Sequence, residues 1–111
     1  MAVKFYTADP EALLEAFVGM IDRGSVVTWE VDDDGDLTHD VANWAGEAWM
    51  RPRFTDDALV FNILENTEIA MSKETYAVYH GRLAESFLAH LDDDITDVQI
   101  TPLAEFEDQI A

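Results

Sequence analysis

The clearest helical pattern in the chain runs from Ser72 to Leu91. At about 100° per residue, one side of this segment collects the residues that predict a helix packed on the rest of the protein: Tyr76, His80, Leu83, Ala84, Phe87 and Leu91. Ser72 suits the N-cap, and the aspartates that follow Leu91 oppose the helix dipole, so we expect the helix to end there. Gly81 disfavours a helix by about 1 kcal/mol, which is easiest to explain if another backbone or a ligand comes close to it.

A strand and a second helix are predicted at the N-terminus. Val3 and Phe5 occupy alternate positions, which is typical of a strand with one buried face. Asp9 followed by Pro10 predicts an N-cap and a first helical residue, and Gly24 predicts the end of that helix. Its apolar positions recur with the helical period and should face the core: Leu13, Leu14, Phe17, Met20 and Ile21.

Residues 25–41 predict a β-hairpin around an Asp-Asp-Gly turn. A slip of one residue would break the apolar match, so the pattern selects one register, with these cross-strand pairs: Val31 and Leu37, Trp29 and His39, Val27 and Val41. Alternate carboxylates before Gly35 resemble the start of a calcium loop, but Val41 occupies the position of the closing glutamate. We therefore predict an acidic turn and no metal site.

Residues 47–64 predict a second hairpin, with these pairs: Phe54 and Leu59, Pro52 and Phe61, Met50 and Ile63. Pro52 indicates a strand with an edge or a bulge. Residues 67–71 fit either a short strand or a loop, and residues 95–101 fit a final strand. Thr101 and Pro102 predict the start of a short helix or docked tail, with one apolar side: Leu103, Phe106 and Ile110.

This order of elements predicts a single α+β domain over residues 1–111. A mainly antiparallel sheet of five to seven strands should carry both helices on one face. A ferredoxin-like arrangement with added strands is the alternative.

The charge of the chain narrows the classes of partner. It has 24 acidic and 6 basic residues and a net charge of -18, while 49% of its residues are hydrophobic. An acidic, lysine-poor composition of this kind is typical of cytosolic proteins from salt-in halophiles, because molar salt shortens the screening length to about 3 Å and relieves carboxylate repulsion. Binding to nucleic acid needs clustered basic residues, so neither nucleic acid nor an anionic membrane is expected as a partner.

The chain has no cysteine, which excludes disulfides and thiolate metal sites. It has no apolar run of about 18 residues, and its first residues lead into a capped helix rather than a signal peptide. We expect a cytoplasmic protein without a cofactor.

Aromatic and cationic residues gather between residues 29 and 53, and they are the candidate ligand-binding groups: Trp29, Trp44, Trp49, Arg51 and Arg53. A guanidinium beside an indole can hold a carboxylate or phosphate and pack its apolar part. The structural alternative is that the arginines pair with neighbouring acids and the tryptophans belong to the core.

His39 and His80 are the candidate catalytic residues. Either could act as a general base in a pocket, or could be a neutral core histidine with satisfied hydrogen bonds. His80 and His90 lack the spacing of a helical two-histidine zinc motif, and no nucleophile elbow, P-loop or dinucleotide fingerprint occurs. The sequence therefore leaves open whether the protein is an enzyme.

Three segments resemble those of a group of small prokaryotic proteins without an assigned function: DGDLTHD with the following Trp44, AWMRP, and YAVYHGRLAESFLAHLD. The resemblance covers most of the chain and implies no reaction. It directs attention to a set of site residues: His39, Trp44, Trp49, Arg51, Tyr79, His80 and Arg82. Tyr79 thereby joins the candidate ligand-binding residues Trp29, Trp44, Trp49 and Arg51.

Two functions follow from these observations. The first is a non-enzymatic module that binds a small anionic ligand or a protein, and that forms a homo-oligomer, as a dimer, to cover apolar area. The alternative is a small hydrolase or isomerase that acts on an anionic molecule, with a histidine base and Arg51 orienting the anion.

Overall fold

The computed structural model describes residues 2–103 and residue 108. The described residues form six strands, two long helices and one short 3-10 helix, with these bounds: β1 (Ala2–Tyr6), α1 (Pro10–Asp22), β2 (Trp29–Val31), β3 (Leu37–His39), β4 (Ala48–Phe54), β5 (Ala58–Glu65), α2 (Lys73–Leu91), η1 (Asp92–Asp94) and β6 (Asp97–Ile100).

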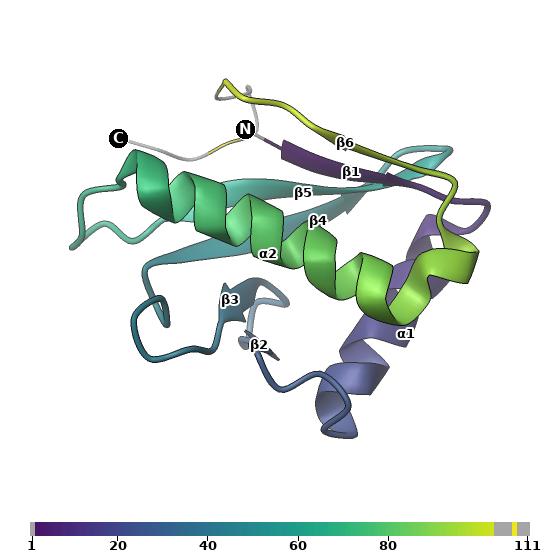
Figure 1. Cartoon of the computed structure of the whole chain (residues 1–111), viewed down its shortest axis with the longest axis horizontal. Coiled ribbons are helices and arrows are strands. Elements are labelled where there is room, and N and C mark those ends of the chain that lie inside the picture. The colour runs from purple at the N-terminus through teal and green to yellow at the C-terminus, as the bar shows by residue number, and fades with distance from the viewer. Residues whose placement is uncertain (1, 104–107, 109–111) are drawn as a thin grey trace.

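The strands form one antiparallel sheet in the order β2-β3-β4-β5-β1-β6 (Figure 1). Four of them, β4-β5-β1-β6, have the order and connections of a ferredoxin-like sheet, with α1 leading from β1 towards β4 and α2 leading from β5 to β6. The β2–β3 hairpin is inserted after α1 and extends the sheet beyond β4. The α+β prediction is thus confirmed, with six strands.

Both helices begin as predicted. The Asp9 carboxylate accepts a hydrogen bond from the Ala12 amide at 3.1 Å, and the Ser72 hydroxyl accepts one from the Thr75 amide at 3.0 Å. The first helix ends before Gly24, whose φ of +77° few other residues adopt.

The core lies between the helices and one face of the sheet. Phe87 of α2 occupies its centre, with its ring centroid 4.2 Å from that of Phe5 on β1 and 4.1 Å from that of Phe17 on α1. One aromatic side chain therefore joins both helices to the sheet.

Most predicted registers are confirmed. Every predicted pair between β4 and β5 occurs, and Trp29 faces His39. The pair between Val27 and Val41 was predicted wrongly, since β2 begins at Trp29 and β3 ends at His39. Beyond that point the chain turns, with the Trp44 amide donating to the Val41 carbonyl at 2.8 Å, and both valines are exposed.

Three smaller predictions were left open by the sequence. Residues 67–71 form a loop. Pro52 lies in β4 past the single residue, Met50, that pairs with β3, so its missing N–H falls where β4 has an open edge. The predicted helix or tail after Thr101 falls mainly on residues 104–107 and 109–111, outside the described residues.

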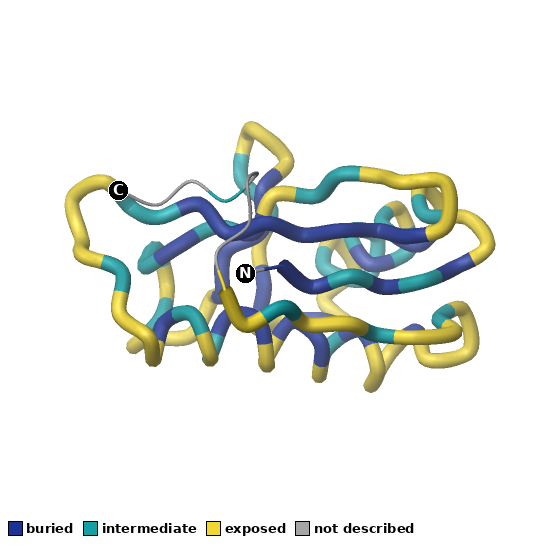
Figure 2. The backbone as a smooth tube through the Cα atoms, turned by 90° about the horizontal axis from the view of Figure 1, so that it is seen from above, coloured by how far each residue is buried: buried dark blue, intermediate teal, exposed yellow. Residues whose placement is uncertain are grey.

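Figure 2 shows how burial is distributed over these elements. Strand β5 is buried along nearly its whole length, whereas β6 is mostly exposed. Helix α2 alternates between buried residues towards the sheet and exposed residues on its outer side. The outer side of α2 and the edge strand β6 are therefore parts of the fold that face solvent.

Candidate functional site

The inserted hairpin has little backbone attachment to the rest of the sheet. Only Leu37 of β3 pairs with β4, at Met50. Side chains supply further links, and they include four of the candidate residues of the sequence: Trp29, His39, Arg51 and Tyr79. We call this group the hairpin junction, and it consists of Trp29, Asp36, Thr38, His39, Arg51, Tyr79 and Ser86.

Trp29 and His39 form the aromatic part of the hairpin junction. The two rings stack with centroids 4.7 Å apart, and the Tyr79 ring meets the indole edge-on at 5.7 Å. The Trp29 indole N–H donates to the Ser86 hydroxyl at 3.1 Å. Trp29 and Tyr79 are 1% and 0% exposed, so both candidate ligand-binding residues lie inside the core.

The surroundings of the His39 imidazole disfavour its protonated form. Its Nδ1 lies 2.7 Å from the Thr28 carbonyl, so Nδ1 carries the proton and donates. Burial lowers the pKa of His39 and outweighs the hydrogen bond to Thr28, which raises it; the Arg82 guanidinium also lowers it, while Asp40 and Glu85 raise it. The Nε2 atom is buried and accepts no hydrogen bond from a described residue.

The Tyr79 hydroxyl holds the loop between β3 and β4. It donates to the Trp44 carbonyl and accepts from the Ala48 amide at 3.3 Å. Thr38, 3.3 Å from the same hydroxyl, donates to the Ala48 carbonyl and accepts from the Gly46 amide. The backbone beside Trp44 is thereby fixed to α2, while the indole itself is half-buried.

Arg51 is bound to a carboxylate of its own chain. Its Nε and Nη2 donate to the two Asp36 oxygens at 2.9 and 2.8 Å, and these hydrogen bonds raise the pKa of Arg51. Asp36 is 3% exposed, and the ion pair between Asp36 and Arg51 therefore attaches the inserted hairpin to β4. Arg51 therefore pairs with an acid of its own chain, which is the structural alternative to an anion-binding arginine.

The turn of the inserted hairpin gathers three carboxylates. One oxygen each of Asp32, Asp34 and Asp36 lies within 4.8 Å of the others. Asp32 Oδ1 accepts from the amides of Asp34 and Asp36 at 2.9 Å, and both Asp36 oxygens accept from Arg51. These carboxylates therefore shape the turn and form the ion pair.

The two candidate histidines lie in different parts of the core. His39 contacts Trp29 and Tyr79, whereas the His80 ring stacks on Tyr76 and its Nδ1 lies 2.7 Å from the Tyr76 carbonyl. Both are almost fully buried. The imidazoles do not converge on one surface where a substrate could meet them.

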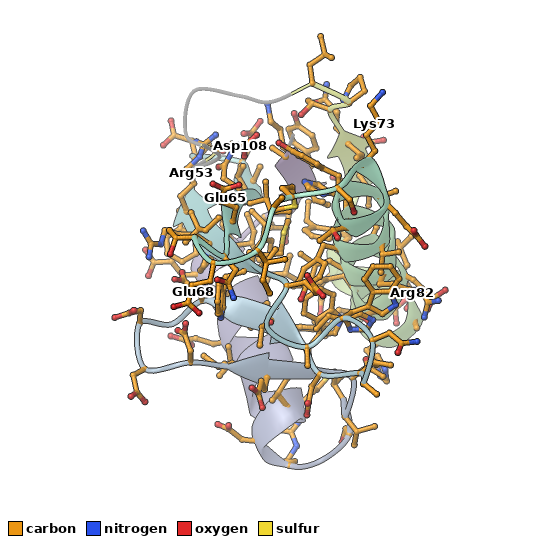
Figure 3. The ribbon with its side chains drawn as sticks, turned by 90° about the vertical axis from the view of Figure 1, so that its left-hand side faces the viewer. Arg53, Glu65, Glu68, Lys73, Arg82 and Asp108 are labelled. Atoms are coloured by element: carbon orange, nitrogen blue, oxygen red, sulfur yellow. The ribbon has the colours of Figure 1, made fainter. Side chains whose placement is uncertain are left out.

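Another polar cluster lies on the sheet face away from the helices. Arg53 Nε donates to Asn62 Oδ1 at 2.8 Å, and the Asp108 carboxylate accepts from Asn62 Nδ2 and the Ile63 amide, each at 3.1 Å. Figure 3 shows Arg53 and Asp108 together, on the opposite side of the molecule from Arg82. Trp49 of β4 is half-buried.

Sequence reasoning missed Asp36, Thr38 and Ser86 as members of the hairpin junction. Asp36 and Thr38 belong to the hairpin, where polar residues are ordinary, and Ser86 lies 57 residues from its partner Trp29. Asp36 could have been identified because it directly precedes β3, and because a chain with few arginines is expected to pair each of them with a nearby acid.

Comparison with known proteins found no matching family model, curated protein or solved structure. Among the described residues, neither α1 nor α2 has the length and apolar character needed to cross a membrane.

Proposed function

We propose that this protein is a non-enzymatic binding module that self-associates in a salt-rich cytoplasm. The observation that carries the proposal is apolar surface left open by a chain of very high charge. Leu88 on α2 and Ile100 on β6 are 47% and 45% exposed, although the net charge of -18 strongly favours a hydrated surface. A second copy that covers such residues removes them from water.

The salt-rich setting is supported by the composition. The few basic residues include only Lys4 and Lys73 as lysines, against 24 acids. A surface of this kind suits high ionic strength, where carboxylates repel one another over short distances only. The resemblance to small prokaryotic proteins is compatible with this setting and adds no reaction.

The enzyme alternative has weaker support. A histidine base must reach its substrate, and His39 and His80 are 1% and 2% exposed. Arg51, the group expected to orient an anion, already binds Asp36 through two hydrogen bonds. A small anionic ligand would therefore have to displace an ion pair that joins the inserted hairpin to β4.

Sedimentation velocity in molar KCl tests the proposal. We expect the sedimenting mass to rise from that of a 12.5 kDa monomer at low micromolar concentration towards twice that value at high micromolar concentration. A mass that stays monomeric at high micromolar concentration would contradict self-association. As a check on the alternative, NMR titration with pooled anionic metabolites should leave the indole and imidazole signals unchanged.

A further inference from the structure

The outer side of α2 combines a protruding side chain, a hollow and two opposite charges. We call it the α2 surface, and its residues are Ala77, Val78, Gly81, Arg82, Glu85 and Leu88. The first five line an open hollow. Leu88 projects from the same helix about two turns further on.

The hollow lies beside Gly81, which has no side chain to fill it. A Cβ built at this glycine meets no described atom within 4 Å apart from its chain neighbours and the backbone of its own helix, so the space outside the helix is open. A glycine at this position disfavours the helix, and no neighbour within the described chain requires it. Close approach by another molecule is what the missing side chain permits.

Arg82 and Glu85 supply complementary charges. Both are exposed, and neither forms an ion pair with a residue that the structure describes. Figure 3 shows Arg82 at the margin of the molecule, on α2. In a chain with only 6 basic residues, an arginine without an acid of its own is suited to an acid from a partner.

A second copy of α2 fits all these features in one register. If Arg82 of each copy meets Glu85 of the other, the two-fold axis crosses the helices between the levels of residues 83 and 84. With a uniform rise of about 1.5 Å per residue, Leu88 then lies at the level of Tyr79 of the other copy. That level falls between Ala77 and Gly81, at the hollow.

The direction of the side chains agrees with this register. At about 100° per residue, Leu88 projects midway between the directions of Ala77 and Gly81. A two-fold axis perpendicular to antiparallel helices keeps each side of one helix against the same side of the other. The leucine of one copy therefore enters the hollow of the other, twice per dimer.

We propose, resting on the self-association argued above, that the α2 surface is an isologous interface for a second copy of this chain. The helices pack antiparallel, Leu88 fills the hollow at Gly81, and Arg82 pairs with Glu85 reciprocally. One helix face covers less than the roughly 800 Å² per partner of a standard interface, so the dimer is weak and is favoured when salt screens the charge of the two copies.

Charge exchange tests the interface most specifically. Arg82→Glu and Glu85→Arg each place like charges together, and we expect each to raise the dimer Kd about tenfold or more. The double variant Arg82→Glu with Glu85→Arg should restore dimerisation. An equimolar mixture of the two single variants should form a heterodimer. These experiments use the lowest KCl concentration at which sedimentation shows the native chain as a dimer, because contact pairs are screened least there.

Gly81→Ala separates association from folding. Alanine fits the open space and favours the helix, so the monomer should melt at the same or a higher temperature while the dimer Kd rises. Leu88→Ala should also raise the Kd. Leu103→Ala is the matched control, because Leu103 is exposed and lies outside α2; it should leave the Kd unchanged.

The outcomes distinguish this interface from self-association in general. A dimer that forms with unchanged Kd in all α2 variants would overturn the α2 interface and leave the proposed self-association standing, with the edge strand β6 as the next surface to change. A native chain that remains monomeric would overturn both. Loss of dimer in the single charge variants without recovery in the double variant would also overturn the reciprocal pairing.

Discussion

The His39 imidazole lies flat against the Trp29 indole, with centroids 4.7 Å apart and 29° between the ring planes. This contact shows one role of the aromatic and cationic residues between residues 29 and 53. Trp29, His39 and Arg51 join an inserted hairpin to a ferredoxin-like sheet to which β3 is bound by a single backbone pair. Trp29 and Arg51, two of the candidate ligand-binding residues, thus also serve as contacts between two parts of one domain.

The buried His39 should make stability depend on pH. Its pKa is lower in the folded chain than the 6.5 of an ordinary histidine, because burial disfavours the imidazolium. The stabilisation is complete above pH 6.5 and is lost as the pH falls from there towards the lowered pKa, since the unfolded chain binds the proton first. Urea unfolding between pH 5.5 and 7.5 should show a slope of at most about 1.4 kcal/mol per pH unit.

Two variants test whether the pH dependence of stability comes from His39. His39→Phe keeps a ring on Trp29 but cannot take a proton, so it should flatten the profile. His90→Gln changes an exposed histidine and should retain it. An unchanged slope in His39→Phe would show that another group is responsible.

Arg51 and Asp36 should stabilise the inserted hairpin. Arg51→Ala leaves a carboxylate that is 3% exposed without its guanidinium, and we expect a loss of about 1–2 kcal/mol, limited by the 45% exposure of the Arg51 side chain. Arg51→Lys should recover only part of this, because an ammonium cannot make the two parallel hydrogen bonds. Chemical denaturation measures the change, with Asp33→Asn in the same turn as the control. Equal effects of Arg51→Ala and Asp33→Asn would contradict this role.

Tyr79 on α2 and Tyr6 on β1 have hydroxyls in different surroundings. The Tyr79 hydroxyl is buried and bonds to the loop carrying Trp44, whereas the Tyr6 hydroxyl makes an exposed bond to Gln99 at 3.1 Å. Tyr79→Phe leaves buried backbone groups without partners and should reduce stability by about 1–3 kcal/mol; Tyr6→Phe should change it by less than about 0.5 kcal/mol.

Hydrogen exchange locates the effect of the Tyr79 hydroxyl. Faster exchange at the Gly46 and Ala48 amides in Tyr79→Phe is expected, because both bind the hydroxyl network. Unchanged exchange there, with stability like that of Tyr6→Phe, would show that this network does not hold the loop.

Stability should rise with salt. A net charge of -18 lies within a radius of gyration of 13.0 Å, which is similar to the screening length of about 10 Å at 0.1 M salt. Molar KCl reduces that length to about 3 Å and with it the repulsion in the folded state. We expect the melting temperature, measured by circular dichroism at low micromolar protein, to increase from dilute buffer to molar KCl. A constant melting temperature would contradict the salt-adapted account.

The secondary structure and most registers could be predicted because they depend on local patterns. Asp9 with Pro10 and Ser72 are capping signals that act within one helical turn, and the alternation of β4 and β5 admits one apolar match. The predicted pairing of Val27 with Val41 was wrong because the apolar alternation of the sequence continues past His39, where β3 ends. There the loop between β3 and β4 is bound to α2 by the hydrogen bond from the Tyr79 hydroxyl to the Trp44 carbonyl. That contact lies 35 residues away in sequence.

The burial of α2 shows a similar limit. The apolar stripe predicted Tyr76 as a core residue and left out Thr75 and Tyr79, yet Tyr79 is fully buried. A single stripe assumes one surface beneath the helix, whereas α2 contacts both the sheet and the inserted hairpin. Conversely, Gly81 was noticed from the sequence, but only the structure places it on the outer side, next to open space.

The most direct test of the α2 interface is an isotope-filtered NOE experiment on a mixture of labelled and unlabelled chain in molar KCl, at a concentration where the sedimenting mass is dimeric. The account predicts NOEs between the Leu88 methyl groups of one copy and the Gly81 and Ala77 protons of the other. Intermolecular NOEs confined to β6, or none involving Leu88, would contradict it.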